Sequence, residues 1–85
     1  MSDVTVYTTN ACGFCTRVKM LLKARDIDYR EVNVWNDPDA FVELARISGM
    51  MTLPQVFVGD VFIGGYNETA EADQSGYLQQ LLAAA

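Results

Sequence analysis

Both cysteines of this chain lie in one short segment, "ACGFCTRVKMLL" (residues 11–22), where only Gly13 and Phe14 separate Cys12 from Cys15. Two thiols at this spacing can exchange with a disulfide and then link to each other, because a thiolate is the nucleophile in that chemistry. Apolar residues with helical periodicity follow directly after the pair. The pattern therefore places Cys12 in a loop that leads into a helix, and Cys15 in the first turn of that helix.

The start of a helix favours an anionic sulfur. Its first backbone N–H groups have no partner within the helix, and the aligned peptide dipoles give this end a partial positive charge. We therefore predict that Cys12 is the more acidic thiol and the attacking nucleophile. Cys15 faces the same way and is placed to attack the mixed disulfide that Cys12 forms. Arg17 and Lys19 would add positive potential nearby.

Several other interpretations of the cysteine pair compete with disulfide exchange. A structural zinc site needs more ligands than two thiolates, and the chain has no histidine and no further cysteine. Buried, inert cysteines would explain scattered residues better than a pair around Gly13 at a helix start. A shared iron–sulfur cluster is another interpretation. A binding module with no chemistry of its own would keep its function when Cys12 is replaced by serine.

Length and charge restrict the class of protein. A chain of 85 residues is too short for a second core, so we expect one domain over residues 1–85. The formal net charge of −5 would repel nucleic acids and anionic lipid, so we expect no nucleic-acid partner. No apolar run is long enough to cross a bilayer, which predicts no membrane association. With so few cysteines and no targeting segment, the chain fits a thiol-reducing, cytoplasmic location.

Runs of β-branched and aromatic residues predict strands along the chain. The first run should be buried on both faces, whereas the second alternates and should be less buried. A Gly59–Asp60 turn favours a tight hairpin between the last two runs. The predicted strands span residues 4–8, 29–34, 56–58 and 61–63.

Three helices are predicted between and after these strands. An apolar stripe that begins at Phe14 gives the first an amphipathic pattern. In the second, Asp37 is a suitable N-cap, Pro38 suits the first helical position, and the stripe stops at Gly49. The third is broken or bent near Gly76. The order β-α-β-α-β-β-α predicts an α/β fold with a four-stranded mixed sheet flanked by helices.

Three segments resemble the glutaredoxin family over nearly the whole chain: "CGFC" (12–15), "TLP" (52–54) and "GG" (64–65). The resemblance implies a thioredoxin-like fold and a dithiol glutaredoxin with a CGFC centre. It implies an enzyme that reduces protein disulfides or glutathione mixed disulfides. In that activity Cys12 attacks and Cys15 resolves the mixed disulfide.

The resemblance also implies a glutathione site. Pro54 would follow a cis peptide bond beside the cysteine pair, and the backbone of Leu53 would be free to pair with an extended ligand. A ligand carboxylate would meet the N–H groups of a helix that starts after Gly65. The residues that the resemblance assigns to glutathione or substrate binding are Thr9, Gly13, Phe14, Thr52, Leu53, Pro54, Gly65, Tyr66, Asn67 and Glu68.

The chain departs from the family where charge would hold glutathione. Thr9 stands near the position of a lysine that many glutaredoxins have before the first cysteine, and Met50 or Met51 replaces a basic residue before "TLP". The acidic pair that is common after the double glycine is here Asn67 and Glu68, so recognition of the γ-glutamyl ammonium would fall to Glu68 or be lost. Each well-formed ionic hydrogen bond that is lost costs about 1.5–3 kcal/mol. We therefore predict weak or altered use of glutathione.

The resemblance also implies cofactors and partners. Glutathione would be a co-substrate, and glutathione or a thioredoxin-type reductase would re-reduce the pair. Ribonucleotide reductase is a plausible partner among protein disulfides, and a monomer is expected, with no metal and no tightly bound cofactor. The alternative is a dimer that binds a [2Fe-2S] cluster through Cys12 and a glutathione sulfur from each subunit. Gly13 would leave room for such a ligand set.

Overall fold

The computed structural model describes residues 3–84 and confirms the predicted order of elements. The predicted tail helix is divided at Gly76, whose φ of 85° lies in the left-handed region that glycine adopts without strain. The elements are β1 (Val4–Thr8), α1 (Gly13–Ala24), β2 (Arg30–Asn33), α2 (Pro38–Ser48), β3 (Gln55–Val58), β4 (Val61–Gly64), α3 (Tyr66–Ser75) and α4 (Tyr77–Ala83).

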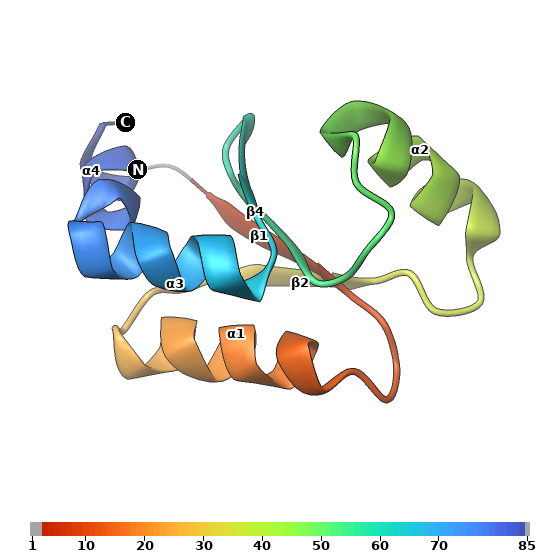
Figure 1. The fold of residues 1–85 in the computed structure, drawn as a ribbon, viewed down its shortest axis with the longest axis horizontal. Helices are drawn as coiled ribbons and strands as arrows, with labels where there is room; N and C mark the ends of the chain where they lie inside the picture. The colour runs from red at the N-terminus through yellow and green to blue at the C-terminus, as the bar shows by residue number, and fades with distance from the viewer. Residues whose placement is uncertain (1–2, 85) are drawn as a thin grey trace.

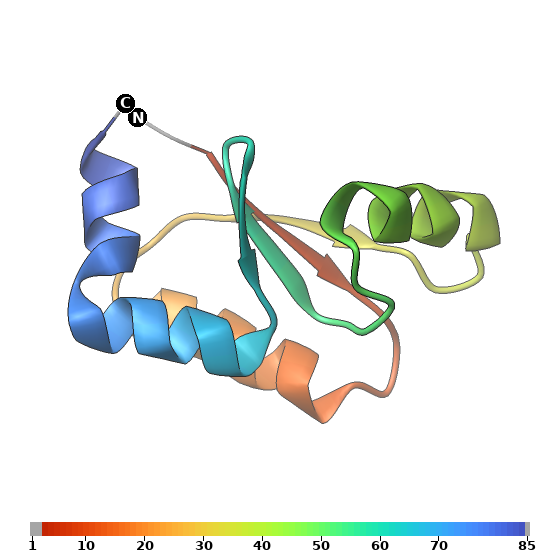
Figure 2. The same cartoon turned by 45° about the horizontal axis from the view of Figure 1, so that its top comes forward.

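The strands form one mixed sheet in the order β2-β1-β3-β4, with β1 and β2 parallel and the other two pairs antiparallel. This confirms the predicted sheet. α1 and α3 lie together on one side of the sheet, and α2 lies on the other (Figure 1). The turned view shows the same separation (Figure 2). Within residues 3–84, no helix combines the length and the hydrophobicity that a membrane crossing requires.

The core lies between the sheet and the helices α1, α3 and α4. Val6 of β1 and Val56 of β3 are completely buried, as their central position in the sheet dictates. Val18 and Leu22 are spaced so that they face the sheet from the same side of α1, and both are also completely buried. Full burial of each such side chain stabilises the fold by about 1.5–3 kcal/mol. This core fixes α1, and with it the cysteine pair at its start.

The sequence signals at the ends of α2 are confirmed in detail. The side chain of Asp37 accepts a hydrogen bond from the N–H of Ala40 at 3.2 Å, and Pro38 occupies the first helical position. Gly49 ends the helix with a left-handed φ of 75°. The chain is therefore directed back toward the sheet at the segment that precedes β3.

Two expectations from the sequence differ from the structure. β2 is shorter by one residue at each end than predicted and is mostly exposed, because it is an edge strand. Phe14 departs from the core-facing stripe of α1, since its side chain is 52% exposed, and this exposure is compatible with its assignment to substrate binding. It lies in the first turn of α1 and packs against the ring of Tyr66 instead. The aromatic ring therefore belongs to the surface around the cysteines.

Candidate active site around the Cys12–Cys15 disulfide

Cys12 and Cys15 are joined by a disulfide at the start of α1, with their Cα atoms 5.2 Å apart. Cys12 is the N-cap residue, and Cys15 lies in the first turn, as predicted. The chain reaches this position from β1 through a short loop, in which Ala11 has a left-handed φ of 53°. A non-glycine residue in this conformation is uncommon and costs free energy, as is often found at functional sites.

The two sulfurs have different surroundings. The backbone N–H of Cys15 donates a hydrogen bond to Sγ of Cys12 at 3.1 Å, so Cys12 uses its sulfur where many helices use a serine or aspartate oxygen. Cys12 is partly exposed, whereas Cys15 is only 2% exposed. An external thiol or disulfide can therefore reach Cys12, and Cys15 can react only with its neighbour.

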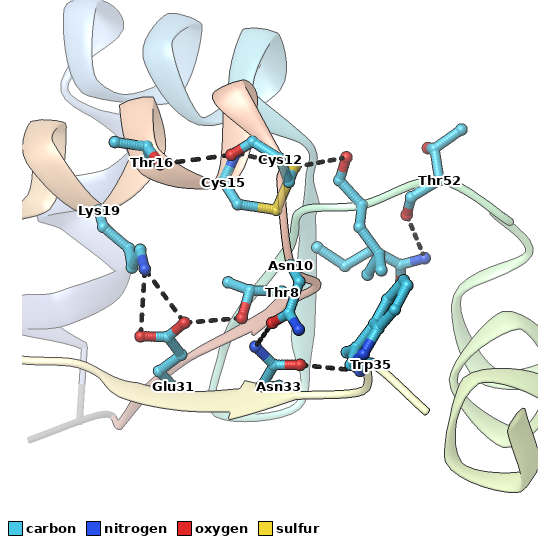
Figure 3. The surroundings of a disulfide bond; sticks show 12 residues. Thr8, Asn10, Cys12, Cys15, Thr16, Lys19, Glu31, Asn33, Trp35 and Thr52 are labelled. Atoms are coloured by element: carbon cyan, nitrogen blue, oxygen red, sulfur yellow. Dashed lines mark hydrogen bonds and ion pairs between the residues drawn. A yellow bond between two sulfur atoms is a disulfide. The ribbon is translucent and has the colours of Figure 1, made fainter. Parts of the chain in front are cut away.

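The segment before β3 lies beside the outer sulfur. The Leu53–Pro54 peptide bond is cis, as the sequence resemblance implies. The carbonyl oxygen of Leu53 lies 3.9 Å from Sγ of Cys12, and Pro54 is buried beneath this segment. Figure 3 shows Cys12 and Cys15 joined at the start of α1, with Thr52 of the preceding segment nearby. The backbone of Leu53 is therefore adjacent to the sulfur that a substrate would meet.

The start of α3 completes the same surface. A Cβ atom added to Gly65 would lie 3.4 Å from the carbonyl oxygen of Pro54, so these two segments are in close contact. The ring centroids of Phe14 and Tyr66 are 6.0 Å apart, which links α1 to α3. The three segments that suggested a family from sequence thus meet at the disulfide. Tyr66 and Asn67 are the first two residues of α3, where the sequence placed them.

Glu68 occupies part of the expected anion site. Its Oε1 accepts a hydrogen bond of 2.7 Å from the N–H of Gly65, so a carboxylate of the protein already satisfies this donor. The side chain lies against Gly64, where an added Cβ would come within 2.6 Å of Cβ of Glu68. A negative charge here would oppose a carboxylate of a ligand at the same helix start.

Lys19 does not contribute a free charge to the site. Its Nζ lies 3.1 Å from Oε2 of Glu31, and Oγ1 of Thr8 donates to the same oxygen at 2.7 Å (Figure 3). The hydrogen bond from Thr8, followed by the contacts with Lys19, lowers the pKa of Glu31 from its ordinary value, although partial desolvation acts in the opposite direction. Arg17, in contrast, has no ion pair in the described part of the chain.

Comparisons with known proteins agree with this geometry. The family model described as Glutaredoxin matches residues 4–63, which is more than half of the chain. A glutaredoxin of Pseudomonas aeruginosa is 36% identical over 99% of this chain and 100% of its own length. Glutaredoxin 3 of Escherichia coli K12 is 32% identical over 96% of this chain and 99% of its own length. The chain belongs to the glutaredoxin family.

Solved glutaredoxins share the fold of this one. The buckwheat glutaredoxin–glutathione complex is 30% identical with a TM-score of 0.87, and the match covers 96% of this chain and 77% of that one. The solution structure of a glutaredoxin from Brucella melitensis is 34% identical with a TM-score of 0.85, covering 96% and 89%. Together with the Cys12–Cys15 pair, family membership makes this glutaredoxin a thiol-disulfide oxidoreductase of the thioredoxin-like fold.

Not every residue that the sequence assigned to the site has a contact that defines its role. Thr9 and Asn67 make no side-chain hydrogen bond or ion pair within residues 3–84. The side chain of Thr52 is exposed, and Met51 is 72% exposed beside it. Met50 is partly buried, which agrees with the expectation that one of the two methionines packs inward. The roles of these residues in glutathione binding stay predictions.

Gln55 is a site residue that the sequence analysis missed. Its side chain is completely buried, and Nε2 donates to the carbonyl oxygens of Met50 and Thr52, each at 2.9 Å. These bonds hold the segment that places Leu53 beside Cys12 in this glutaredoxin. The only signal in the sequence is a polar residue directly after "TLP", at the start of an otherwise apolar strand.

The donor set of this glutaredoxin also limits how it could bind a metal. Within residues 3–84, no three or more cysteine, aspartate or glutamate side chains gather closely enough to hold an ion. Of the two cysteines, only Cys12 is partly exposed. A cluster bound at Cys12 would therefore take its other ligands from outside the chain.

Proposed function

We propose that this glutaredoxin reduces protein disulfides and glutathione mixed disulfides in two exchange steps. The thiolate of Cys12 attacks one sulfur of the substrate, whose S–S bond breaks as the first thiolate leaves and takes a proton from water. The thiol of Cys15 then loses its proton and attacks the sulfur of Cys12. The second substrate thiolate leaves, the Cys12–Cys15 disulfide forms, and two electrons have passed to the substrate.

One observation supports this order above all: the unequal surroundings of the two sulfurs. Sγ of Cys12 is partly exposed and accepts the N–H of Cys15, which favours its thiolate once the pair is reduced. Cys15 is buried against it and is reached only through Cys12. These unequal surroundings support Cys12 as the nucleophile and Cys15 as the resolving thiol.

Glutathione is the electron donor in this proposal. Two glutathione thiols would reduce the Cys12–Cys15 disulfide and leave as glutathione disulfide, which balances the two electrons. The solved buckwheat relative is a complex with glutathione, and here the backbone of Leu53 and the start of α3 flank Cys12 in a position to hold such a ligand. A thioredoxin-type reductase is the alternative donor. The protein would act as a monomer in the cytoplasm, with ribonucleotide reductase among its candidate substrates.

Glutathione should bind weakly in this site. Thr9 and Met51 supply no charge where the family often has a basic residue, and the carboxylate of Glu68 already accepts the N–H of Gly65. Oxidised protein partners would depend less on these charges, because an extended peptide can pair with the backbone of Leu53. The exposed side chain of Met51 would add an adaptable apolar contact.

The test compares a glutathione mixed disulfide with an intramolecular protein disulfide as substrates. Cys12→Ser should abolish turnover of both. Cys15→Ser should lose turnover of the protein disulfide and retain that of the mixed disulfide, because glutathione itself can resolve the intermediate. Equal activity of Cys12→Ser and the parent on either substrate would contradict the proposed nucleophile.

A [2Fe-2S] carrier is the second candidate function. Apart from its chain neighbours and its own helix backbone, no atom lies within 4 Å of a Cβ placed on Gly13, which is compatible with a ligand next to Cys12. A relative from poplar that is 33% identical, with a TM-score of 0.87, was solved in a holo form. Cys12 and glutathione would supply the ligands in each of two subunits. Anaerobic purification with glutathione decides: a brown dimer favours the carrier, and a colourless monomer active in reduction favours the oxidoreductase.

A further inference from the structure

We propose that Arg17 determines specificity for glutathione, because its guanidinium, held on the rings of Phe14 and Tyr66, binds a carboxylate of glutathione joined to Cys12. The inference rests on the glutathione coupling proposed above and names the residue that gives the site its charge selectivity.

Arg17 lies on two aromatic rings, one of which belongs to Phe14, between the two cysteines in sequence. Its Cζ lies 5.6 Å from the ring centroid of Phe14 and 5.6 Å from that of Tyr66, within the range of about 6 Å in which a cation is attracted to an aromatic face. Phe14 precedes it by one helical turn on the same face of α1, and Tyr66 begins α3. The rings restrict the side chain, so less conformational entropy is lost when the guanidinium binds a ligand.

The charge of Arg17 is available, unlike that of most cations in the chain. Of six lysine and arginine residues, three are paired with carboxylates in the described part of the chain. The pairs are Lys19–Glu31, Arg25–Asp73 and Arg46–Glu43. Among residues 3–84, the cations without an ion pair are Arg17, Lys23 and Arg30. Lys23 lies in the last turn of α1, and Arg30 lies on the edge strand β2.

The ligand needs such a cation here. Glutathione carries two carboxylates and one ammonium, so it is an anion, and a protein of formal charge −5 repels it at a distance. Glu68 is the carboxylate of α3 closest in sequence to Tyr66. It accepts the N–H of Gly65 and forms no ion pair with Arg17. Within residues 3–84 no carboxylate pairs with the guanidinium of Arg17, and its planar set of N–H donors matches a carboxylate.

The first experiment measures steady-state turnover of a glutathione–peptide mixed disulfide by the parent, Arg17→Gln and Lys23→Gln. Lys23→Gln is the matched control, because it removes another unpaired cation from the same helix. Arg17→Gln should raise KM by about two- to fivefold, as for a partly exposed ion pair, with kcat unchanged. Lys23→Gln should match the parent. Equal KM values for the parent and Arg17→Gln would overturn the inference.

The second experiment identifies the group that Arg17 binds. The glycyl carboxylate and the α-carboxylate of the glutamyl residue are converted to amides in separate substrates. One of the two amide substrates should have a higher KM than unmodified substrate with the parent. With Arg17→Gln the same amide should not raise KM, because the guanidinium that bound the carboxylate is already absent. Two amides that each raise KM by the same factor in both proteins would overturn the inference.

A final measurement separates ligand binding from activation of the thiol. The rate at which Cys12 is alkylated by a neutral reagent should be the same in the parent and in Arg17→Gln across the pH range. An altered pH profile that accounts for the change in turnover would overturn the binding role. Absence of mixed-disulfide turnover by the parent itself would instead contradict the proposed function, and that result appears before any variant is compared.

Discussion

Cys12 has two functions in one atom, because its sulfur both caps α1 and forms the reactive bond. The N–H of Cys15 donates to Sγ of Cys12 at 3.1 Å, although the oxidised sulfur is only a weak acceptor. In the reduced protein a thiolate at the same position is a stronger acceptor and also meets the positive end of the helix dipole. Ionisation of Cys12 and the stability of the first turn of α1 are therefore coupled.

This coupling predicts an acidic thiol. In reduced Cys15→Ser, which leaves a single thiol, the pKa of Cys12 should lie below the value of about 8.5 for an ordinary cysteine. The measurement is the rate of alkylation by a neutral reagent as a function of pH. Cys12→Ser is the control, because its remaining thiol at Cys15 is buried and should react slowly at every pH. A midpoint at or above that of free cysteine would contradict the capping argument.

At the residue scale, contiguous motifs were predictable and contacts between distant residues were not. Cys12, Cys15 and Pro54 belong to short contiguous motifs, so their placement could be predicted from the sequence. Gln55 and Arg17 act through partners that only the fold brings together: carbonyl groups of a preceding loop for one, and an aromatic ring of α3 for the other. The local sequence gives only weak signals for them: a polar residue directly after "TLP" for Gln55, and a cation close to the cysteine pair for Arg17.

At the scale of elements, the site is formed where the N-terminal ends of α1 and α3 lie close to the segment that leads into β3. The junction between β4 and α3 is especially tight, because Gly64 has a φ of 132° and its backbone touches the side chain of Glu68. Only glycine adopts this conformation without strain. The position of α3, and hence of Tyr66 against the ring of Phe14, depends on that junction.

Replacement of Gly64 should therefore disrupt the fold more than replacement of Gly13. Gly64→Ala places a Cβ 2.6 Å from Cβ of Glu68 in a strained conformation, and we expect a loss of more than about 2 kcal/mol in the free energy of unfolding. Gly13→Ala meets no atom within 4 Å at the start of a helix and should change stability by less than about 1 kcal/mol. Urea unfolding of the two variants measures both, and equal stabilities would contradict the steric argument.

The contact of Glu31 with β1 and α1 predicts a dependence of stability on pH. The folded pKa of Glu31 lies below its ordinary value of 4.5, so the deprotonated form stabilises the folded state. That stability is present above pH 4.5 and is lost as pH falls through the lower, folded pKa. Because the pair is partly exposed, Glu31→Gln should cost about 1 kcal/mol or less at neutral pH.

The check is urea unfolding of the parent and Glu31→Gln at a series of pH values. The difference between their unfolding free energies should shrink as pH falls below 4.5. Glu71→Gln is a suitable control, since this exposed side chain has no ion pair in the described part of the chain. A difference that is constant over the whole pH range would mean that the charge of Glu31 is not its cause.

Elements with explicit end signals were predicted most accurately. Asp37 and Gly49 defined α2 because capping depends on residues that are adjacent in sequence. The ends of β2 were less predictable, since an edge strand ends where its single neighbour ceases to pair with it. Phe14 fitted the helical stripe, but the stripe alone does not reveal that the first turn of α1 extends to the surface occupied by α3.

Across the whole molecule, one core connects β1 and β3 with α1, α3 and α4, while α2 lies on the other side of the sheet. Leu78 of α4 is completely buried in this core, although it is distant from the cysteines in sequence. The C-terminal helix therefore supports the same packing that fixes α1. A small domain with one shared core should unfold as a single unit.

Leu78→Ala tests whether the domain unfolds as one cooperative unit. We expect a loss of about 2–5 kcal/mol in the free energy of unfolding, from lost burial and the cavity that remains. Circular dichroism would follow the helices, and the fluorescence of Trp35, the single tryptophan, would follow the loop after β2. Both signals should shift together. Gln80→Ala on the exposed side of α4 should leave them unchanged, and separate transitions in Leu78→Ala would contradict a single cooperative unit.

Because Cys15 is buried, an external thiol or disulfide can react with this protein only at Cys12. A reductant from solution can bond only to the sulfur of Cys12, so the buried Cys15 must be the leaving thiolate. In the proposed cycle, reduction of the protein and reduction of its substrate would therefore both take place at Cys12. A single covalent adduct on Cys12 would therefore block both the reduction of the protein and the reduction of its substrate.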